Sequence, residues 1–336
     1  MPLDWLNTLP RQLLGLLPTP LQPLDRLSAE LGGPRVWVKR DDCTGLATGG
    51  NKTRKLEYLL GAASAAGADT VITFGAVQSN HARQTAAACA VAGMECHLLL
   101  ARKVPWDDVN YEHLGNPQLD RLLGASVHLV DAREFNSRYA ALRAELEARS
   151  RRVYVIPTGG SNATGALGYA ACAAELIDQA SALEELQLTD IAHASSSAGT
   201  QAGLIAGFAA LKPSPDIRVH GINVSEPDQQ SLFDAVQKIA SELLQTHQPG
   251  TQLDPGQILI DSRYLGEGYG LPTRLTVEAI RKVAACEGLL MDPVYSGKAM
   301  GGLIDRIRRG EFDTVQDLVF IHTGGSAALP VYGSVL

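Results

Sequence analysis

The sequence predicts an α/β fold in which parallel-rich, twisted sheets are covered by helices. Short runs rich in Val, Ile and Leu recur along the chain, and each is followed by Gly- or Ser-rich residues and then by a helical pattern. This alternation is typical of βα units, whose strands are parallel. Hydrophobic residues make up 45% of the 336 positions, so the chain is long enough to bury the core of two domains.

The same pattern gives the order of the elements. The expected strands are residues 35–39, 70–74, 97–100, 127–130, 153–156, 191–194, 219–224 and 318–321. The expected helices are residues 52–66, 80–92, 164–179, 201–210, 227–244, 273–287 and 298–309. The polar stretch 103–116 is expected to form an exposed loop or rim without a chemical role. Because no repeat or linker divides the chain, a second domain is expected to be an insertion.

Charge and cysteine content exclude several classes of protein. The formal charge of -7 is spread along the chain without a block of Lys and Arg, which argues against binding to nucleic acid. The 5 cysteines are far apart and form no C-x-x-C motif, so neither a disulfide framework nor a metal site is expected. No stretch approaches the roughly 20 apolar residues that span a bilayer, and prolines interrupt the N-terminal segment. A cytoplasmic protein without a membrane partner is expected.

A strand, a glycine-rich loop and a lysine at a helix start follow one another between Lys39 and Lys55. The loop nearly matches the nucleotide-phosphate motif G-x-x-x-x-G-K-[ST], but Asn51 separates Gly50 from Lys52, which disfavours a nucleotide triphosphatase. A lysine at the positive end of a helix dipole and partly removed from water has a lowered pKa, which favours the neutral amine that forms an imine. Lys52 is therefore a candidate Schiff-base lysine, and the alternative is an ordinary surface lysine.

Three further segments place polar groups after expected strands. Ser79 and Asn80 follow one strand and open a helix, where an isolated pair would act only as a helix cap. Ser195–Gly203 and Pro157–Asn162 follow two other strands, and small residues that lead into a helix expose backbone N–H groups suited to a phosphate. Because glycine-rich turns are common in α/β proteins, each segment is informative mainly in combination.

Two tyrosines lie on loops in the C-terminal third of the chain. Tyr269 lies between two glycines, and Tyr295 precedes the sequence Ser296-Gly297-Lys298. Tyrosines on such loops are candidate acid–base or substrate-orienting groups. The alternative is a role in packing or at an interface.

Together these segments resemble the tryptophan-synthase-β-like, or fold type II, pyridoxal phosphate enzymes. They resemble more narrowly the branch that contains 1-aminocyclopropane-1-carboxylate (ACC) deaminase, D-cysteine desulfhydrase and L-cysteate sulfo-lyase. The similarity runs from Pro18 to Gly325, and its most specific parts are Gly49–Leu56 and Gln78–Gln84. It implies bound pyridoxal 5'-phosphate and a homodimer. It also implies a large domain of residues 1–47 and 162–336 and a small domain of residues 48–161, with the cofactor in the cleft between them.

The resemblance implies a role for each matching residue. Lys52 matches the lysine that binds the cofactor as an imine and then removes the Cα proton, and Asn80 matches the side chain that hydrogen-bonds the ring hydroxyl. Ser79 matches a serine close to the substrate carboxylate, and Tyr269 and Tyr295 match the active-site tyrosines that assist the leaving group. The phosphate loop is matched by Ser197, Ala198, Gly199 and Thr200.

Two positions separate this chain from ACC deaminase. That enzyme carries a glutamate at the position of Ser296 and a leucine at the position of Thr323. Neutral partners at the ring nitrogen of the cofactor fit an easier reaction, in which a carbanion at Cα expels a good leaving group from Cβ. The resemblance therefore implies β-elimination from L-cysteate, which releases sulfite, or from D-cysteine, which releases sulfide, with pyruvate and ammonia as products.

The sequence favours L-cysteate slightly over D-cysteine. Asp41–Leu46 and Ser296 look more like the sulfo-lyases, whereas Thr323 is shared with the desulfhydrases. Ser79 and Asn80 are expected to bind the substrate, and further donors for a sulfonate are expected near Thr44, Thr158, Ser161 and Asn162. The alternatives are ACC deamination, amino-acid racemisation and non-catalytic binding of the cofactor.

Overall fold

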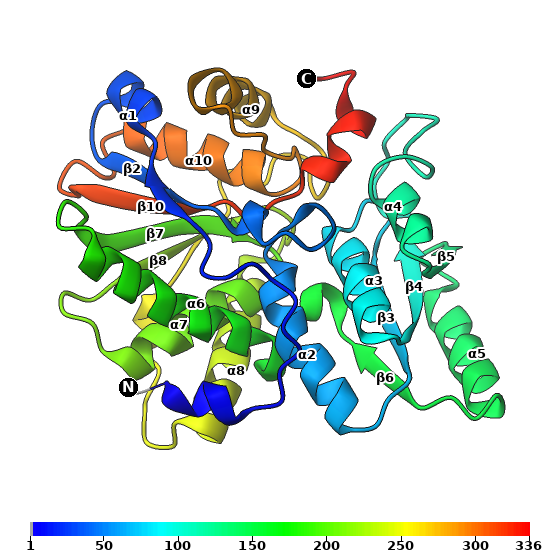
Figure 1. Cartoon of the computed structure of the whole chain (residues 1–336). Coiled ribbons are helices and arrows are strands. Elements are labelled where there is room, and N and C mark those ends of the chain that lie inside the picture. Colours follow the sequence, from blue (N-terminus) through cyan, green and yellow to red (C-terminus); the bar gives the residue numbers. More distant parts are fainter. Residues whose placement is uncertain (1–2) are drawn as a thin grey trace.

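In the computed structural model, which describes residues 3–336, the chain forms two mainly parallel sheets with helices packed against them (Figure 1). The strands are β1 (Leu21–Pro23), β2 (Arg35–Lys39), β3 (Thr70–Ala76), β4 (Glu95–Ala101), β5 (Ser126–Val130), β6 (Val153–Ile156), β7 (Leu188–Ser195), β8 (Arg218–Asn223), β9 (Ile258–Asp261) and β10 (Asp317–Ile321). One sheet has the order β1-β2-β10-β7-β8-β9 and the other β5-β4-β3-β6. Every neighbouring pair is parallel except β1 and β2.

The sheets are covered by helices of very different length. They are α1 (Asp25–Leu31), α2 (Lys52–Ala65), α3 (Asn80–Ala92), α4 (Asn116–Leu122), α5 (Phe135–Ala148), α6 (Ala163–Ala182), α7 (Gly199–Leu211), α8 (Gln229–His247), α9 (Arg274–Glu287) and α10 (Ser296–Arg308). The predicted α/β class with parallel-rich, helix-covered sheets is thus confirmed. Within the described part of the chain, none of these helices combines the length and the apolar character needed to cross a lipid bilayer.

The two sheets draw on different parts of the chain. The four-stranded sheet uses residues 70–156, whereas the six-stranded sheet combines strands from both ends of the chain. Helix α2 lies between the sheets in Figure 1 and packs against both α6 and α3. A Cβ on Gly168 of α6 would lie 2.2 Å from the backbone oxygen of Arg54, so α2 and α6 approach closely because this residue is glycine. The domain boundaries at residues 47/48 and 161/162 stay a prediction.

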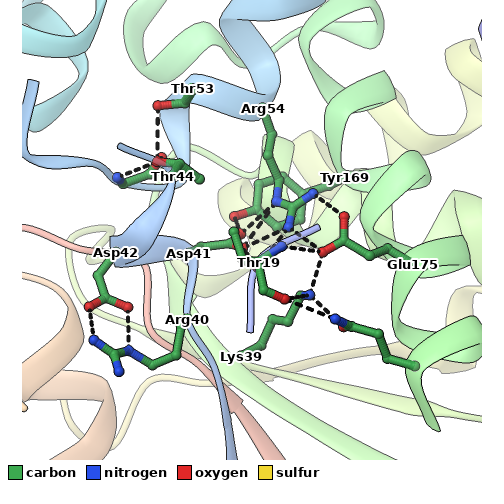
Figure 2. Close-up of polar contacts among 12 residues, drawn as sticks. Thr19, Lys39, Arg40, Asp41, Asp42, Thr44, Thr53, Arg54, Tyr169 and Glu175 are labelled. Atoms are coloured by element: carbon green, nitrogen blue, oxygen red, sulfur yellow. Dashed lines mark hydrogen bonds and ion pairs between the residues drawn. The ribbon is translucent and has the colours of Figure 1, made fainter. Parts of the chain in front are cut away.

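A buried ion network fixes the first turn of α2 to the six-stranded sheet (Figure 2). The side chain of Arg54 is only 1% exposed. Its Nε and Nη2 donate to Asp41, just after β2, over 2.9–3.0 Å, and Nη1 and Nη2 donate to Glu175 of α6 over 2.9 Å. Burial opposes ionisation of Asp41, but the Arg54 guanidinium holds the pKa of this carboxyl below its usual value.

Further side chains complete the network around the two carboxylates. Tyr169 donates its hydroxyl to Asp41 at 2.5 Å, and Thr19 Oγ1 donates to the same carboxylate at 2.9 Å. Lys39 Nζ pairs with Glu175 and also donates to the Thr19 carbonyl at 2.7 Å. The network therefore contains matched charges, and it joins α2 to the end of β2, to α6 and to the segment before β1 (Figure 2).

We predict that Arg54→Ala lowers the free energy of unfolding by about 3–5 kcal/mol, because it leaves Asp41 buried without its paired cation and leaves Glu175 paired with Lys39 alone. The measurement is urea denaturation followed by circular dichroism. Arg143→Ala is the matched control: Arg143 pairs with Glu147 on the surface of α5, and its loss should cost less than about 1 kcal/mol. Equal losses for the two variants would show that the network does not stabilise the fold.

Candidate active site

Loops at the carboxyl ends of several parallel strands meet around a cavity of about 620 Å³. They include the loops after β3, β4, β6, β7, β8, β9 and β10, and the start of α2 joins them. Ligands bind at this edge of parallel sheets because several loops converge there. Most residues that the sequence singles out line this cavity: Lys52, Ser79, Asn80, Thr158, Ser197, Ala198, Thr200, Tyr269, Tyr295 and Thr323.

Three other predicted residues lie just behind the cavity wall. Ser161 Oγ donates to Ser197 Oγ at 2.8 Å and accepts from the N–H of Gly199 at 3.3 Å. Ser296 is fully buried, and its hydroxyl donates to Asp292 Oδ1 at 2.7 Å. Because this hydroxyl is already bonded inside the protein, contact between Ser296 and a cofactor ring stays a prediction.

Lys52 is the first residue of α2 and reaches into the cavity. The residue before it is held in place, since Asn51 N–H donates to the carbonyl of Thr323 at 3.1 Å. Removal from bulk water lowers the pKa of Lys52 to about 8, although the negative charge of Asp292 acts in the opposite direction. Part of the amine is therefore neutral near neutral pH, as the proposed imine requires.

The start of α7 has the features of a phosphate cradle. Ala198 has a φ of 67°, a strained value for a residue other than glycine, and the helix begins directly after it. The N–H groups of Ala198, Thr200 and Gln201 have no acceptor within residues 3–336, as expected in a first helical turn. With the hydroxyls of Ser197 and Thr200, these groups are suited to bind an anion.

Lys55, which no sequence motif singles out, lies beside this cradle. Its Nζ donates to the carbonyl of Gly159 at 3.2 Å and to Ser161 Oγ at 3.3 Å. A Cβ on Gly199 would come within 2.9 Å of this nitrogen, so the ammonium group lies against the first turn of α7. Burial and the charge of Lys52 lower the pKa of Lys55, and a phosphate would stabilise its charged form. The available signal was its spacing of three residues from Lys52, which places both lysines on one face of α2.

Asn80 opens α3, and its neighbours fix the orientation of its side-chain amide. Its Oδ1 accepts from Arg83 Nη1 at 3.2 Å and from Asn116 Nδ2 at 3.0 Å. Both of these hydrogen bonds of the side chain are made by Oδ1, so the amide NH2 group is left to donate to an oxygen in the cavity. A ring hydroxyl is an oxygen of this kind.

Ser79 is the N-cap of α3, and it also lines the cavity. Its Oγ accepts from the N–H of Ala82 at 3.1 Å. A Cβ on Gly75 would lie 2.6 Å from this oxygen, so the close approach of β3 to Ser79 requires glycine. The first turn of α3 carries the positive end of the helix dipole, which favours a carboxylate. The helix-cap interpretation and the substrate-binding interpretation of Ser79 are therefore compatible.

Tyr269 and Tyr295 meet inside the cavity. Their hydroxyl oxygens are 2.5 Å apart, and their rings pack edge to face with centroids 5.8 Å apart. Burial raises the pKa of both hydroxyls, so both remain protonated at neutral pH. One proton lies between the two oxygens, and the other is available to a group in the cavity.

Several further cavity residues are not predicted by any motif. Asn51 Nδ2 donates to Thr200 Oγ1 at 3.1 Å and thereby connects the start of α2 to the phosphate cradle. His81 contributes a buried ring. Lys103 and Glu267 contribute exposed charges, and Lys103 begins the stretch to which the sequence assigns no chemistry. Tertiary folding brings these side chains to the cavity, and no local sequence pattern predicts this.

Comparison with known proteins agrees with this site. The model of the pyridoxal-phosphate dependent enzyme family matches residues 13–324. The chain belongs to this family. Its cofactor is therefore pyridoxal 5'-phosphate, as the resemblance implies.

Within the family, the chain is similar along its whole length to several known proteins and to a solved structure. ACC deaminase from Burkholderia ambifaria (strain MC40-6) is 42% identical over 336 residues and covers 98% of both chains. D-cysteine desulfhydrase from Salmonella choleraesuis (strain SC-B67) is also 42% identical, over 99% of both chains. The crystal structure of an ACC deaminase homologue has a TM-score of 0.87 and 37% identity, and the match covers 100% of this chain and 99% of that one. The expected fold type II architecture is thus confirmed.

The cavity geometry fits pyridoxal phosphate. The amine of Lys52 suits the aldehyde, and the first turn of α7 with the ammonium group of Lys55 suits the phosphate. The free NH2 group of Asn80 suits the ring hydroxyl. The cavity thus offers a complementary group for each polar part of the cofactor.

We predict that cofactor-free protein binds added pyridoxal phosphate covalently at a rate that rises with pH through a midpoint of about 8. Below this pH the amine of Lys52 is protonated and cannot attack the aldehyde; above it the neutral amine dominates. The measurement is the growth of the imine absorbance, with borohydride trapping and peptide mapping to locate the modified lysine. Lys52→Ala should form no trapped product, and a midpoint near that of an exposed lysine, roughly 10.4, would contradict the prediction.

Proposed function

We propose that this protein is a carbon–sulfur lyase that removes the sulfur group from Cβ of a small cysteine-type amino acid. L-cysteate would yield sulfite and D-cysteine would yield sulfide, with pyruvate and ammonia as the other products. The observation that carries the proposal is the presence of Lys52 and the hydrogen-bonded pair Tyr269–Tyr295 in one cavity. A base for Cα and a proton donor for the leaving group are both needed for β-elimination.

The protein side chains divide the reaction into binding and proton transfer. Bound pyridoxal phosphate would supply the electron sink that stabilises negative charge at Cα. The first turn of α3, with Ser79, would bind the substrate carboxylate, since N–H groups and the helix dipole point to this end. Lys52 would take the Cα proton, because its lowered pKa keeps part of the amine neutral.

The tyrosine pair would act at the leaving sulfur. The raised pKa of Tyr269 and Tyr295 keeps both hydroxyls protonated, and the proton that is not shared between them is free to move to a departing thiolate. Hydrosulfide and sulfite are bases of similar strength, so loss of the pair should slow the release of either.

Different features support the two substrates. D-cysteine is supported by relatives named D-cysteine desulfhydrase at 42% identity. L-cysteate is supported by the cavity itself, where Lys103 adds an exposed cation and Thr158 adds a hydroxyl, because a sulfonate needs such donors.

ACC deamination is the second candidate function, favoured by a 42% identical relative of that name. The chain has the neutral Ser296 in place of the glutamate that the resemblance assigns to ACC deaminase, which argues against it. Racemisation would need only a base on each face of Cα. We also propose a homodimer and a cytoplasmic location, which rest on the family resemblance and on the composition.

We predict that the purified yellow protein releases pyruvate from L-cysteate or D-cysteine in a parallel assay that also contains L-cysteine and ACC. Sulfite and sulfide are measured in the same samples. Pyruvate with sulfite identifies a sulfo-lyase, and pyruvate with sulfide from D-cysteine identifies a desulfhydrase. Release of 2-oxobutyrate from ACC would refute the argument from Ser296, and loss of Cα configuration without any product would favour a racemase.

We predict that Tyr295→Phe and Tyr269→Phe each lower kcat by about 10²–10⁴-fold, the usual contribution of a positioned acid or base. Tyr264→Phe is the matched control, because Tyr264 is also buried but donates to Asp305 and does not line the cavity. Its kcat should stay within about twofold of the original value. If all three variants behave alike, the tyrosine pair takes no part in proton transfer.

A further inference from the structure

His81 carries an unpaired nitrogen into the wall of the active-site cavity. The residue lies in the first turn of α3, next to Asn80, and is only 3% exposed. It lines the same cavity as Lys52. Its ring Nδ1 is buried and has no hydrogen-bond partner within residues 3–336. A buried polar atom of this kind is normally bonded, so this one is expected to bind a group that enters or moves in the cavity.

The other ring nitrogen fixes the tautomer of His81. Nε2 lies 2.8 Å from the hydroxyl of Thr73 on β3, and the same hydroxyl donates to the carbonyl of Ile156 at 2.8 Å. A threonine hydroxyl has only one proton, and a carbonyl oxygen can only accept. The proton between Nε2 and Thr73 therefore belongs to Nε2. In the neutral ring, Nδ1 is consequently a bare acceptor that must be matched by a donor.

A phosphate is a poor partner for this atom. Burial and the charges of Lys52 and Lys55 lower the pKa of His81, so the ring is neutral, and a bare nitrogen repels phosphate oxygens. The amine of Lys55 is a poor candidate as well: two of its N–H groups donate to Gly159 and Ser161, and a third, in the charged form, lies beside the first turn of α7, where a phosphate would accept it. Lys52 remains, since its Nζ has no hydrogen-bond partner within residues 3–336 and its charge acts on His81 more strongly than that of Lys55.

We propose that His81 is a positioning residue whose Nδ1 accepts a hydrogen bond from the amine of Lys52 and holds it as the base of the reaction. The two groups line one cavity but are not bonded in the structure, so the bond requires that rotation of the flexible lysine stem bring Nζ to the ring. The inference rests on the proposed role of Lys52 in proton removal from Cα.

The bond would serve both protonation states of Lys52. A neutral amine has two N–H groups and one lone pair, so donation of one N–H to Nδ1 leaves the lone pair for the Cα proton. After proton transfer the ammonium gains a third N–H, while the bond to Nδ1 persists and stabilises the charge. His81 itself transfers no proton in this scheme, because Nδ1 starts without one and the bond to Thr73 holds the other nitrogen.

Two substitutions of His81 test the roles of the two ring nitrogens separately. In His81→Gln, the amide reaches the place of Nε2 and can keep the bond to Thr73, but no acceptor remains at the place of Nδ1. In His81→Asn, the shorter amide offers an acceptor near Nδ1 instead. We expect His81→Gln to lower kcat about 10- to 100-fold with KM within about twofold, and His81→Asn to recover part of this loss.

A second readout needs no substrate and follows Lys52 directly. In cofactor-free His81→Gln, the ammonium of Lys52 loses an acceptor, so the midpoint for imine formation with added pyridoxal phosphate should fall by about one pH unit. Side-chain ¹⁵N NMR of the wild-type protein should show the His81 tautomer with the proton on Nε2. Thr73→Val removes the acceptor that fixes this tautomer, so it should change the midpoint in the same direction.

His193→Asn is the matched control. His193 is also a buried histidine with one unpaired nitrogen, Nε2, but it does not line the cavity. Asparagine keeps a donor to the carbonyl of Ala194, which Nδ1 contacts over 2.9 Å. An unchanged midpoint in His81→Gln, or an equal shift in His193→Asn, would overturn the inference. Because the midpoint and the tautomer are measured without turnover, they decide on His81 even if the protein acts on none of the proposed substrates.

Discussion

The position of Lys52 depends on a buried network of ion pairs around Arg54, two residues further along α2. Arg54 places a guanidinium between Asp41, just after β2, and Glu175 of α6. Buried charges are costly unless they are paired and hydrogen-bonded on every side, so this arrangement tolerates little displacement of α2. The glycine at position 168 permits the close packing that the ion pairs need. The helix start, and with it the direction of Lys52, is thus set from outside the cavity.

With α2 fixed, the electrostatics of the cavity follow from a few groups. Lys52 and Lys55 lie on one face of the helix, and burial lowers the pKa of both amines. The first turn of α7 adds a third positive feature at the same place. An anion is the natural partner of this combination, and the phosphate of the family's cofactor supplies one. Once bound, that phosphate would balance the charge of Lys55, and Lys52 could change its protonation state after the substrate amine has displaced it from the cofactor.

The parts of the fold that repeat a simple period were predictable from the sequence, and the parts that depend on tertiary contacts were not. The predicted strands 35–39 and 153–156 and the helix 80–92 coincide with β2, β6 and α3, because both strands are rich in β-branched and aromatic residues and glycine ends the helix. The sequence pattern misses β1, which has three residues and a proline, and α5, which buries only two leucines. It also predicts Lys52 but not Lys55 or His81, since their roles arise from neighbours distant in the sequence.

The placement of buried carboxylates near the cavity also bears on the proposed reaction. The buried carboxylate of Asp292 accepts from the backbone N–H groups of Val294, Tyr295 and Ser296, and from the Ser296 hydroxyl. Its charge therefore organises the loop that presents Tyr295 and opposes the lowering of the Lys52 pKa. At position 296, where the resemblance assigns ACC deaminase a carboxylate, this chain has only a hydroxyl that is already bonded. A site with protonated tyrosine hydroxyls but without that carboxylate fits the proposed reaction, in which a carbanion expels sulfur quickly, better than one in which the carbanion must persist.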